Sequence, residues 1–399
     1  MQSILPEQLA SPLPAALHEL PPPDEAARAH MQRLHALVVA EMQAEGFMSF
    51  ARFMELALYA PGLGYYAAGT AKFGAGGDYV TAPELSPLFG AAVAQQVAQC
   101  VTSETDTVIE LGAGTGRMAA DILRELERLE RLPRSYQIIE LSPELRARQH
   151  ATLRGCAPAL CDRVQWLERL PERIRGVVIG NEVLDALPVA LVGTSGGRIA
   201  ELGVTFDAAT QRFSWARRDA TGELLAAARE LSLPDEYTTE VHLAARGLVR
   251  TIGAVLEHGI ALFIDYGFPR HEYYHPQRSS GTLMCHYRHH SHGDPLCLVG
   301  LQDITSHLDF TALADAAADV GLSTLGYATQ AHFLMGCGIL DRLCAYDPQD
   351  AATYARVCAG VQPLLSPAEM GELFKVIAFG RGIDGPLLGF RSGNRVGRL

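Results

Sequence analysis

A short glycine-rich stretch between a strand and a helix is the feature that most constrains this chain. Residues 107–111 form an apolar run, Gly112, Gly114 and Gly116 follow at every second position, and residues 117–132 show the period of an amphipathic helix. Glycine lets the backbone turn sharply and approach a ligand closely, and the start of a helix presents unpaired N–H groups. The stretch predicts a nucleotide-type binding turn, although such turns also form where a helix simply packs close to a strand.

Strands and helices alternate after this turn, and the chain is long enough, at 399 residues, for two domains or one large core with insertions. Further strands are expected at 136–140, 164–166, 177–180, 260–265 and 374–379, and helices at 143–150, about 239–257 and 309–319. Such alternation forms a parallel sheet with crossover helices, whereas residues 189–217 alternate like antiparallel strands beside it. We expect an α/β, Rossmann-like fold with a seven-stranded, mainly parallel sheet, an N-terminal helical region and inserted antiparallel strands.

The chain is expected to divide into three parts. Residues 1–30, rich in Pro and Ala, predict a flexible arm, and residues 31–103 predict two helices followed by a glycine-rich loop that contacts substrate or cofactor. Residues 104–399 hold the nucleotide-binding domain, with insertions at about 189–240 and 266–310. The second insertion is polar, His-rich and irregular in pattern.

Composition excludes several classes of protein. A net charge of -12 with no dense Lys/Arg run argues against nucleic acid as a partner, and it fits either solubility or a basic partner. The eight cysteines show no Cys-x-x-Cys spacing, so a zinc ribbon and a disulfide scaffold are both disfavoured. No apolar stretch is long enough to cross a bilayer, and the first thirty residues lack a targeting pattern. We therefore expect a soluble, cytoplasmic protein without membrane insertion.

Polar residues follow the strands on either side of the glycine turn. A dinucleotide turn needs a third glycine where this chain has Arg117, whereas Glu140, at the end of the second strand, can accept both hydroxyls of a ribose. Glu140 could instead be a helix-start or surface carboxylate. Asn181, Glu182 and Asp185 follow the fourth strand, where ligands of α/β sheets bind, although Asp185 could simply begin a helix.

Several motifs together identify the chain as similar to a known family. They are Gly64-Tyr-Tyr66, Gly77 to Pro87, Glu110 to Gly116, Glu140 to Pro143, Asn181 to Pro188, Ile264 to Gly267, Gly281 to Leu283 and Asp303 to Phe310. The set resembles the mitochondrial complex I assembly-factor methyltransferases and their bacterial relatives, over about residues 46–380. This resemblance implies a class I methyltransferase fold, S-adenosylmethionine as cofactor, and an arginine of a respiratory complex I subunit or similar protein as acceptor.

The resemblance and the strand positions suggest roles for individual residues. The expected cofactor-binding set is Glu110, Gly112, Gly114, Gly116, Glu140, Trp166 and Asn181, in which Asn181 contacts the methionine part. Trp166 flanks adenine in this scheme, although a buried core indole explains it equally well. Glu182, Asp185 and Glu84 are the candidate catalytic residues, because an arginine acceptor stays cationic and carboxylates can grip its guanidinium. Tyr65, Tyr66 and Tyr79 could cover the site or merely pack.

The remaining alternatives concern metal binding and function. The run from Cys285 to His292 is dense in imidazole, but we expect an exposed loop beside the acceptor groove and no metal site, because nothing in the run fixes a coordination geometry. A small-molecule methyltransferase and a non-catalytic cofactor-binding assembly scaffold both keep the same cofactor residues. A dehydrogenase is disfavoured by the glycine spacing. The oligomeric state is not predicted.

Overall fold

The computed structural model describes residues 20–42, 46–68 and 81–399. Most of the expected flexible arm and Tyr79 therefore lie outside the described residues. Helix α1 (Glu25–Met42) already begins inside the segment expected to be an arm, and α2 (Phe50–Tyr59) follows it. Both helices expected between residues 30 and 59 are present.

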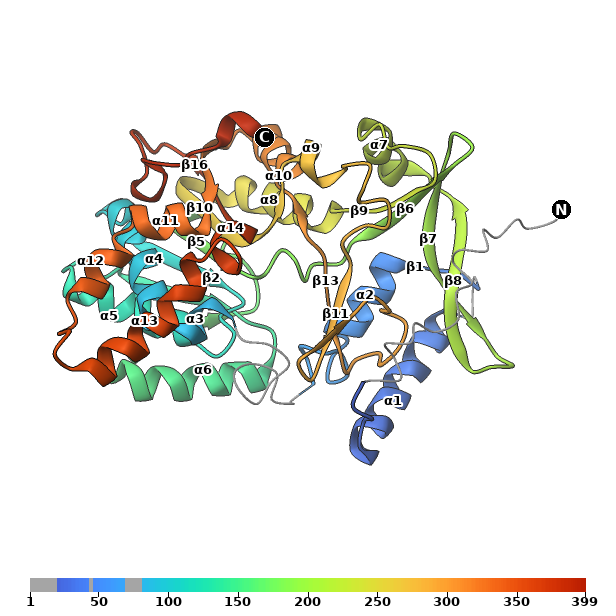
Figure 1. The fold of residues 1–399 in the computed structure, drawn as a ribbon, viewed down its shortest axis with the longest axis horizontal. Helices are drawn as coiled ribbons and strands as arrows, with labels where there is room; N and C mark the ends of the chain where they lie inside the picture. Colours follow the sequence, from blue (N-terminus) through green and yellow to red (C-terminus); the bar gives the residue numbers. More distant parts are fainter. Residues whose placement is uncertain (1–19, 43–45, 69–80) are drawn as a thin grey trace.

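An eight-stranded sheet forms the centre of the molecule: seven strands lie in the order β15-β16-β10-β5-β2-β3-β4, and the short eighth strand, β14, pairs with the end of β10 (Figure 1). Its strands are β2 (Thr107–Leu111), β3 (Ser135–Ile139), β4 (Val164–Leu167), β5 (Ile174–Asn181), β10 (Leu256–Phe268), β14 (Leu308–Asp309), β15 (Ser323–Thr329) and β16 (Phe374–Arg381). Adjacent strands in this order are parallel, except that β16 is antiparallel to both of its neighbours, β10 and β15. The expected α/β class with a mainly parallel sheet is confirmed.

Helices cover both faces of this sheet because successive strand residues point to opposite sides. Val177 and Ile179 of β5 belong to one core cluster, together with helices α4 (Pro87–Cys100) and α5 (Arg117–Arg128). Val178 belongs to the other, with α8 (Leu243–Val255) and α10 (Phe310–Asp319). Helix α4, which precedes residue 104, packs against α5 in the core beside the central sheet.

The inserted antiparallel strands form a separate sheet rather than an extension of the central one. It has the order β1-β7-β6-β9, with β8 paired to β7. The strands are β1 (Met48–Ser49), β6 (Ala190–Ser195), β7 (Arg198–Asp207), β8 (Arg212–Asp219) and β9 (Tyr237–Val241). Helices α1 and α2 pack on this sheet, at the right of Figure 1. The helix expected from residue 239 starts only at Leu243, because the preceding residues pair with β6.

The His-rich run is a hairpin rather than the irregular loop that was expected, and its exposed part is limited to residues 288–291 around the turn. Strands β11 (Met284–Tyr287), β12 (His290–His292) and β13 (Asp303–Thr305) form a small antiparallel sheet. Cys285 is fully buried opposite His292, with the core cluster of α2 beneath it. Among the described residues no group of three His, Cys, Asp or Glu side chains is placed to hold a metal ion.

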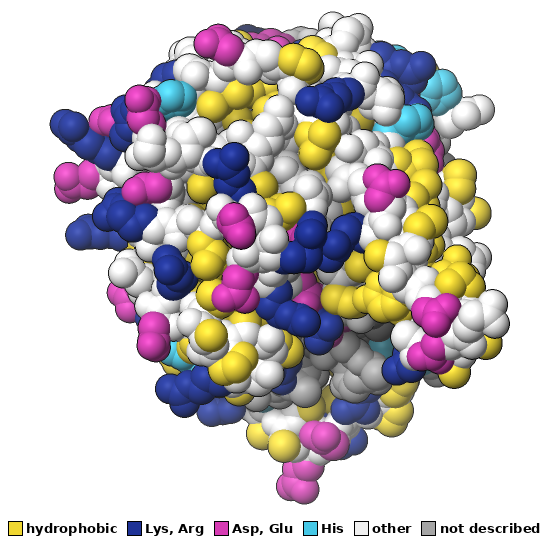
Figure 2. All heavy atoms as spheres, turned by 90° about the vertical axis from the view of Figure 1, so that its left-hand side faces the viewer, with side chains coloured by type: hydrophobic (Ala, Val, Ile, Leu, Met, Phe, Trp, Pro, Cys, Tyr) yellow, Lys and Arg dark blue, Asp and Glu magenta, His cyan; other side chains and the backbone are white. Residues whose placement is uncertain are grey.

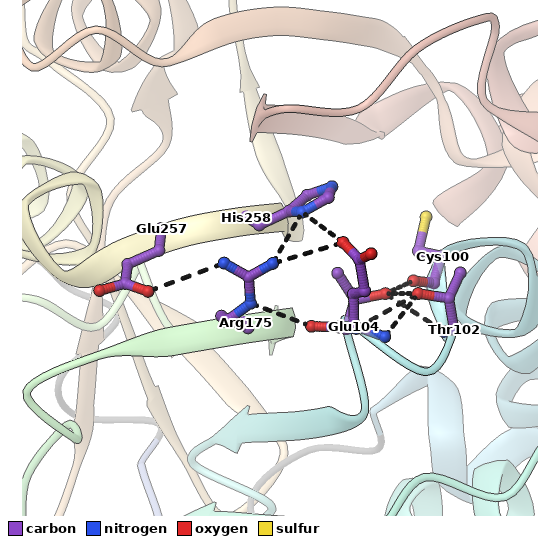
Figure 3. A network of polar contacts seen from close by, with 7 residues as sticks. Cys100, Thr102, Glu104, Arg175, Glu257 and His258 are labelled. Atoms are coloured by element: carbon purple, nitrogen blue, oxygen red, sulfur yellow. Dashed lines mark hydrogen bonds and ion pairs between the residues drawn. The ribbon is translucent and has the colours of Figure 1, made fainter.

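A polar network lies at the opposite edge of the central sheet, where the strands begin (Figure 3). Arg175 at the start of β5 donates to the carbonyl oxygen of Glu104 at 3.2 Å and lies 3.5 Å from its carboxylate and 3.8 Å from Glu257. Arg175 also approaches Nδ1 of His258 at 3.4 Å. These groups are at least partly exposed, and such surface pairs contribute at most about 1 kcal/mol each. The network ties β5 and β10 to the loop before β2.

One face of the molecule carries mixed charges. Figure 2 shows basic side chains interspersed with acidic ones over the face formed by the left-hand side of Figure 1, with hydrophobic side chains gathered along one margin. On this face, interspersed charges of both signs do not form the basic track that a nucleic-acid backbone requires. Within the described part of the chain, no helix has the length and apolar character to cross a membrane.

Candidate functional site

A cavity of about 800 Å³ opens at the carboxyl ends of β2, β3 and β5. The predicted site residues that line it are Glu84, Glu110, Gly112, Gly114, Glu140, Asn181 and Glu182, and Tyr66 also lines it. Gly116, Trp166, Asp185 and Tyr65 are not among its lining residues. The strand ends therefore bring together most of the residues that the sequence pattern singled out, as expected for an open α/β sheet.

The glycine turn adopts backbone conformations that other residues rarely reach. Gly112, Gly114 and Gly116 have φ values of 58°, 51° and 83°. A Cβ on Gly114 would meet nothing within 4 Å, so this glycine leaves its backbone open to the cavity. A Cβ on Gly116 would lie 2.9 Å from the Cα of Gln149. Gly116 thus serves close packing of α5 against α6 (Pro143–Cys156), whereas Gly112 and Gly114 face the ligand space.

Glu110 is a buried carboxylate at the end of β2. The Tyr136 hydroxyl donates to Glu110 Oε2 at 2.6 Å, and Oε1 has no hydrogen-bond partner among the described residues. Burial raises the pKa of Glu110 to about 7, against the opposing effect of the Tyr136 hydrogen bond. A cationic or N–H donor entering the cavity would satisfy this oxygen.

Glu140 is held in a fixed orientation at the end of β3. The backbone N–H of Ser142 donates to Oε1 at 2.9 Å and the Gln149 side chain donates to Oε2 at 3.0 Å. Burial raises the pKa of Glu140, and these hydrogen bonds oppose that rise. Its two oxygens retain lone pairs toward the cavity, which fits the predicted recognition of two neighbouring hydroxyls.

Trp166 does not flank the cavity, so the expected contact with adenine is not supported. Its indole N–H donates to Gln149 Oε1 at 2.8 Å, and its ring stacks on His150 with centroids 3.7 Å apart. Gln149 in turn donates to Glu140 and to the carbonyl oxygen of Gly114 at 3.1 Å. Trp166 therefore positions Glu140 through Gln149 and does not touch the ligand space.

Replacing Trp166 by phenylalanine tests this indirect role. Removal of the indole N–H leaves the side chain of Gln149 without the hydrogen bond that holds it in place. We expect the Kd for the ligand of the cavity to rise about 5-fold, which corresponds to the free energy of roughly one hydrogen bond. The same change should have no further effect in a Glu140→Ala background, because both act through one carboxylate. The measurement is the calorimetric Kd of the natural protein, of each single variant and of the double variant. Equal losses in both backgrounds would indicate direct contact instead.

Glu182 occupies a strained position where β5 ends. Its φ of 51° is uncommon for a residue other than glycine, and its N–H donates to the carbonyl oxygen of Ile264 at 2.9 Å. Glu182 Oε1 accepts from the Asn181 side chain at 3.0 Å and from the backbone N–H of Ala82 at 3.4 Å. Burial raises the pKa of Glu182 to about 7. The strained backbone thus turns a carboxylate into the cavity.

Asp185 lies behind this site, so the expectation that it grips the acceptor together with Glu182 is not supported. It is 5% exposed and accepts a hydrogen bond from the Tyr266 hydroxyl. Asp265 accepts from the backbone N–H groups of Leu184 and Asp185 at 3.0 and 3.2 Å. Burial raises the pKa of Asp185 to about 7. No helix begins at Asp185, so that alternative fails as well, and its place suggests a positioning role for the turn after Glu182.

The outer wall of the cavity comes from the N-terminal region. Tyr59 and Tyr66 both line it, with ring centroids 5.5 Å apart in a stacked arrangement. The Tyr59 hydroxyl donates to the carbonyl oxygen of Ala186 at 3.0 Å, and the Tyr66 hydroxyl donates to Asp303 at 2.8 Å. Glu84, on the short helix α3 (Ala82–Leu85), accepts from the Thr115 hydroxyl. The cavity therefore has carboxylates at the ends of the strands and an aromatic wall from the N-terminal region.

Comparison with known proteins identifies the family of this chain. The model of a family described as S-adenosyl-L-methionine-dependent methyltransferases matches residues 88–328. The chain belongs to this family. S-adenosylmethionine is accordingly the cofactor of this methyltransferase, and the chain is an enzyme of the methyl-transfer class.

Two solved structures and two curated relatives are similar along most of the methyltransferase. A Burkholderia thailandensis protein solved with S-adenosyl-homocysteine bound has 51% identity and a TM-score of 0.92, over 95% of this chain and 100% of that one. A native structure of a protein from the same organism has 50% identity and a TM-score of 0.89 over the same shares. The mitochondrial protein arginine methyltransferase NDUFAF7 of Danio rerio is 28% identical over 85% of this chain and 84% of its own length. Its Drosophila melanogaster homologue is 27% identical over 86% and 84%.

These relatives correct one expectation. The sequence pattern predicted a cytoplasmic protein, but the curated relatives are named mitochondrial proteins, which contradicts that prediction. Compartment follows from a receptor-read signal rather than from the folded domain, so composition and core pattern do not determine it.

Residues that the sequence pattern did not reveal complete the site. Tyr59 lies in an ordinary amphipathic helix, and Gln149 lies in the middle of α6, so neither position carries a local signal. Tyr266 and Asp303 are parts of the motifs that carry the family resemblance, but their contacts with Asp185 and Tyr66 join segments 81 and 237 residues apart. Such contacts become visible only in the folded chain.

Proposed function

We propose that this methyltransferase transfers methyl groups to an arginine side chain of a protein. The proposal depends on the observation that a carboxylate and an aromatic wall line the same cavity. The carboxylate is Glu182, at the end of β5, and the wall is formed by Tyr59 and Tyr66. A carboxylate satisfies the charge and N–H groups of a guanidinium, and ring faces attract the same cation by about 0.5–2 kcal/mol. The curated relatives are named protein arginine methyltransferases, which supports the same acceptor.

The residues of the cavity fit the cofactor. Glu140 would accept the two ribose hydroxyls, and the backbone of Gly112 and Gly114 would lie against the nucleoside. The unpartnered oxygens of Glu110 and Asn181 are placed to receive the ammonium group of the amino-acid part. When bound, S-adenosylmethionine supplies an electrophilic methyl group. S-adenosylmethionine has no pyrophosphate, which agrees with a site that has two buried carboxylates, Glu110 and Glu140, and Arg117 where a dinucleotide turn has its last glycine.

Glu182 would hold the acceptor and stabilise its charge. An arginine has a pKa above about 12 and remains protonated on binding, so the site must orient one guanidinium nitrogen while keeping the positive charge satisfied. The hydrogen bonds from Asn181 and Ala82 leave Glu182 with further lone pairs for the acceptor. Glu84 is a further candidate carboxylate for this end of the cavity, and Asp185 supports the turn from behind.

The pH dependence follows from the raised pKa of Glu182. Its carboxyl is protonated below about pH 7 and then cannot neutralise a guanidinium. We expect kcat/KM for the acceptor to rise about tenfold per pH unit below that value and to level off above it. Initial rates between about pH 5.5 and 8.5 measure the profile. A Glu182→Gln variant should lose the rise, and a flat profile in the natural protein would show that this carboxyl does not carry the acceptor charge.

Transfer of a labelled methyl group tests the function directly. The natural protein is incubated with radiolabelled S-adenosylmethionine and extracts of cells that lack it, followed by identification of the labelled residue. The resemblance to complex I assembly factors makes a respiratory complex subunit the first acceptor to examine. Label on protein arginine supports the proposal. Label only on a small metabolite would favour a small-molecule methyltransferase, and cofactor binding without transfer to any acceptor would favour an assembly scaffold.

A further inference from the structure

A second cavity, of about 440 Å³, lies at the same edge of the central sheet but on the far side of β10. Its walls include Phe268 at the end of β10, Tyr327 near the end of β15 and Lys375 at the start of the antiparallel β16. None of its lining residues belongs to the methyltransferase cavity. The proposed arginine methylation therefore leaves this cavity without a role.

Lys375 is a buried cation at this cavity without an acidic partner of its own. It is 6% exposed, and Nζ donates to the backbone carbonyl oxygens of Glu372 and Leu373. An ammonium group has three N–H donors, so one remains. No carboxylate of the described residues lies within ion-pair distance of Nζ: the Glu372 side chain pairs with Arg395 at 2.7 Å. Burial lowers the pKa of Lys375 to about 8.

Tyr327 also lines this cavity and carries a second unsatisfied donor, on β15 two residues from Thr329, the partner of Lys375 in the sheet. Its side chain is 1% exposed, and its hydroxyl has no hydrogen-bond partner among the described residues. The backbone of Tyr327 is fully engaged, because its N–H donates to Asn394 and its carbonyl oxygen accepts from Arg395. A buried hydroxyl without a partner costs roughly 1–3 kcal/mol, so a ligand that satisfies it gains this energy on binding.

We propose that this cavity binds a monocarboxylate with an apolar body. One carboxylate can accept from the remaining N–H of Lys375 and from the Tyr327 hydroxyl at once. Phe268, Pro269 and Leu373 supply apolar wall for the rest of the molecule. Three glutamates and two arginines also line the cavity: Arg395 pairs with Glu372 at 2.7 Å and Arg398 with Glu272 at 3.8 Å. These ion pairs leave Lys375 facing the negative charge of Glu369, so a single carboxylate fits this charge balance better than a doubly charged phosphate.

Calorimetry with phenylacetate as the probe tests the site on the full chain. Phenylacetamide, which has the same shape without the charge, is the control ligand and should bind at least about tenfold more weakly. Tyr327→Phe removes only an unpartnered hydroxyl, so the variant should fold as the natural protein does and bind phenylacetate about 5-fold more weakly. Lys375→Met should weaken binding further, and Tyr346→Phe, outside the cavity, should not change it.

Mass spectrometry gives a second readout that needs no variant. The chain has two lysines, Lys72 and Lys375, so amine acetylation can be followed at each one separately. Phenylacetate should slow acetylation of Lys375 and leave the rate at Lys72 unchanged. Absence of calorimetric binding at millimolar probe, or binding that both Tyr327→Phe and Lys375→Met leave unchanged, would overturn the proposal. Methyl transfer is not measured in either experiment, so failure here leaves the proposed function untouched.

The carboxylate could belong to a free metabolite or to the chain end of a bound protein. A peptide that ends in phenylalanine with a free carboxylate, compared with its amidated form, separates these sources. Tighter binding of the free-acid peptide than of phenylacetate assigns the cavity to a protein terminus. Tighter binding of phenylacetate assigns it to a small molecule.

Discussion

Replacing Glu182 by glutamine is expected to lower kcat for methyl transfer about 100- to 1,000-fold, with cofactor affinity nearly unchanged. Glutamine keeps an oxygen that can accept from Asn181 and from the backbone N–H of Ala82, so the strained turn at the end of β5 should persist. The variant loses the negative charge that faces the acceptor. A neutral amide cannot balance a guanidinium in a cavity partly shielded from water.

Single-turnover rates, together with a calorimetric Kd for S-adenosyl-homocysteine, separate this effect from a binding defect. Glu127→Gln is the matched control, because Glu127 is an exposed carboxylate on α5 away from the cavity and should retain full activity. Retention of more than about half the natural rate in Glu182→Gln would remove Glu182 from the reaction and leave Glu84 as the carboxylate to test.

Replacing Glu140 by alanine is expected to raise the Kd for S-adenosyl-homocysteine about 100-fold. The variant loses two charge-assisted hydrogen bonds to the ribose, each of about 1.5–3 kcal/mol, and the freed Gln149 recovers part of this energy by bonding elsewhere. The backbone N–H of Ser142 also loses its acceptor, so a modest fall in Tm should accompany the loss of affinity.

Calorimetry and a thermal melt of the same sample measure both effects. Glu168→Ala is the control: Glu168 lies just after β4, is largely exposed and pairs with Arg146 at 3.7 Å, so its removal should leave cofactor affinity intact. If Glu140→Ala binds S-adenosyl-homocysteine as tightly as the natural protein, the ribose is held elsewhere and the orientation assigned to the cofactor is wrong.

Local patterns were sufficient to predict the part of the site that lies on one βα unit and its neighbour. The strand Thr107–Leu111 was predicted with its observed limits, because a short apolar run before glycines has few other structures available. Glu110, Gly112, Gly114, Glu140 and Asn181 all line the cavity because parallel strands end at a common edge. The positions of these residues follow from the order of the strands along the chain and from their parallel direction, both of which the alternation of strands and helices in the sequence predicts.

Side-chain direction over longer distances could not be predicted in this way. Asp185 is three residues from Glu182, yet the turn sends it to Tyr266 and away from the cavity. Trp166 ends near the correct strand edge but reaches Gln149. Cys285 lies in a run that reads as exposed, yet pairing with β12 and β13 buries it against α2. In each case a contact distant in sequence decided the outcome over the local pattern.

The origin of Tyr59 has a consequence for how acceptor choice can change between related enzymes. Helix α2 precedes the central sheet in the chain and packs on the separate antiparallel sheet, yet its last residue reaches Ala186 beside Glu182. The proposed acceptor side of the cavity is thus built from two stretches of the polypeptide, the N-terminal segment that carries Tyr59 and Tyr66 and the turn after β5 that carries Glu182. We expect exchange of residues 46–68 between two homologues to change acceptor preference, while Glu140 and the glycine turn, which come from later in the chain, keep their place in the methyl-donor part of the cavity.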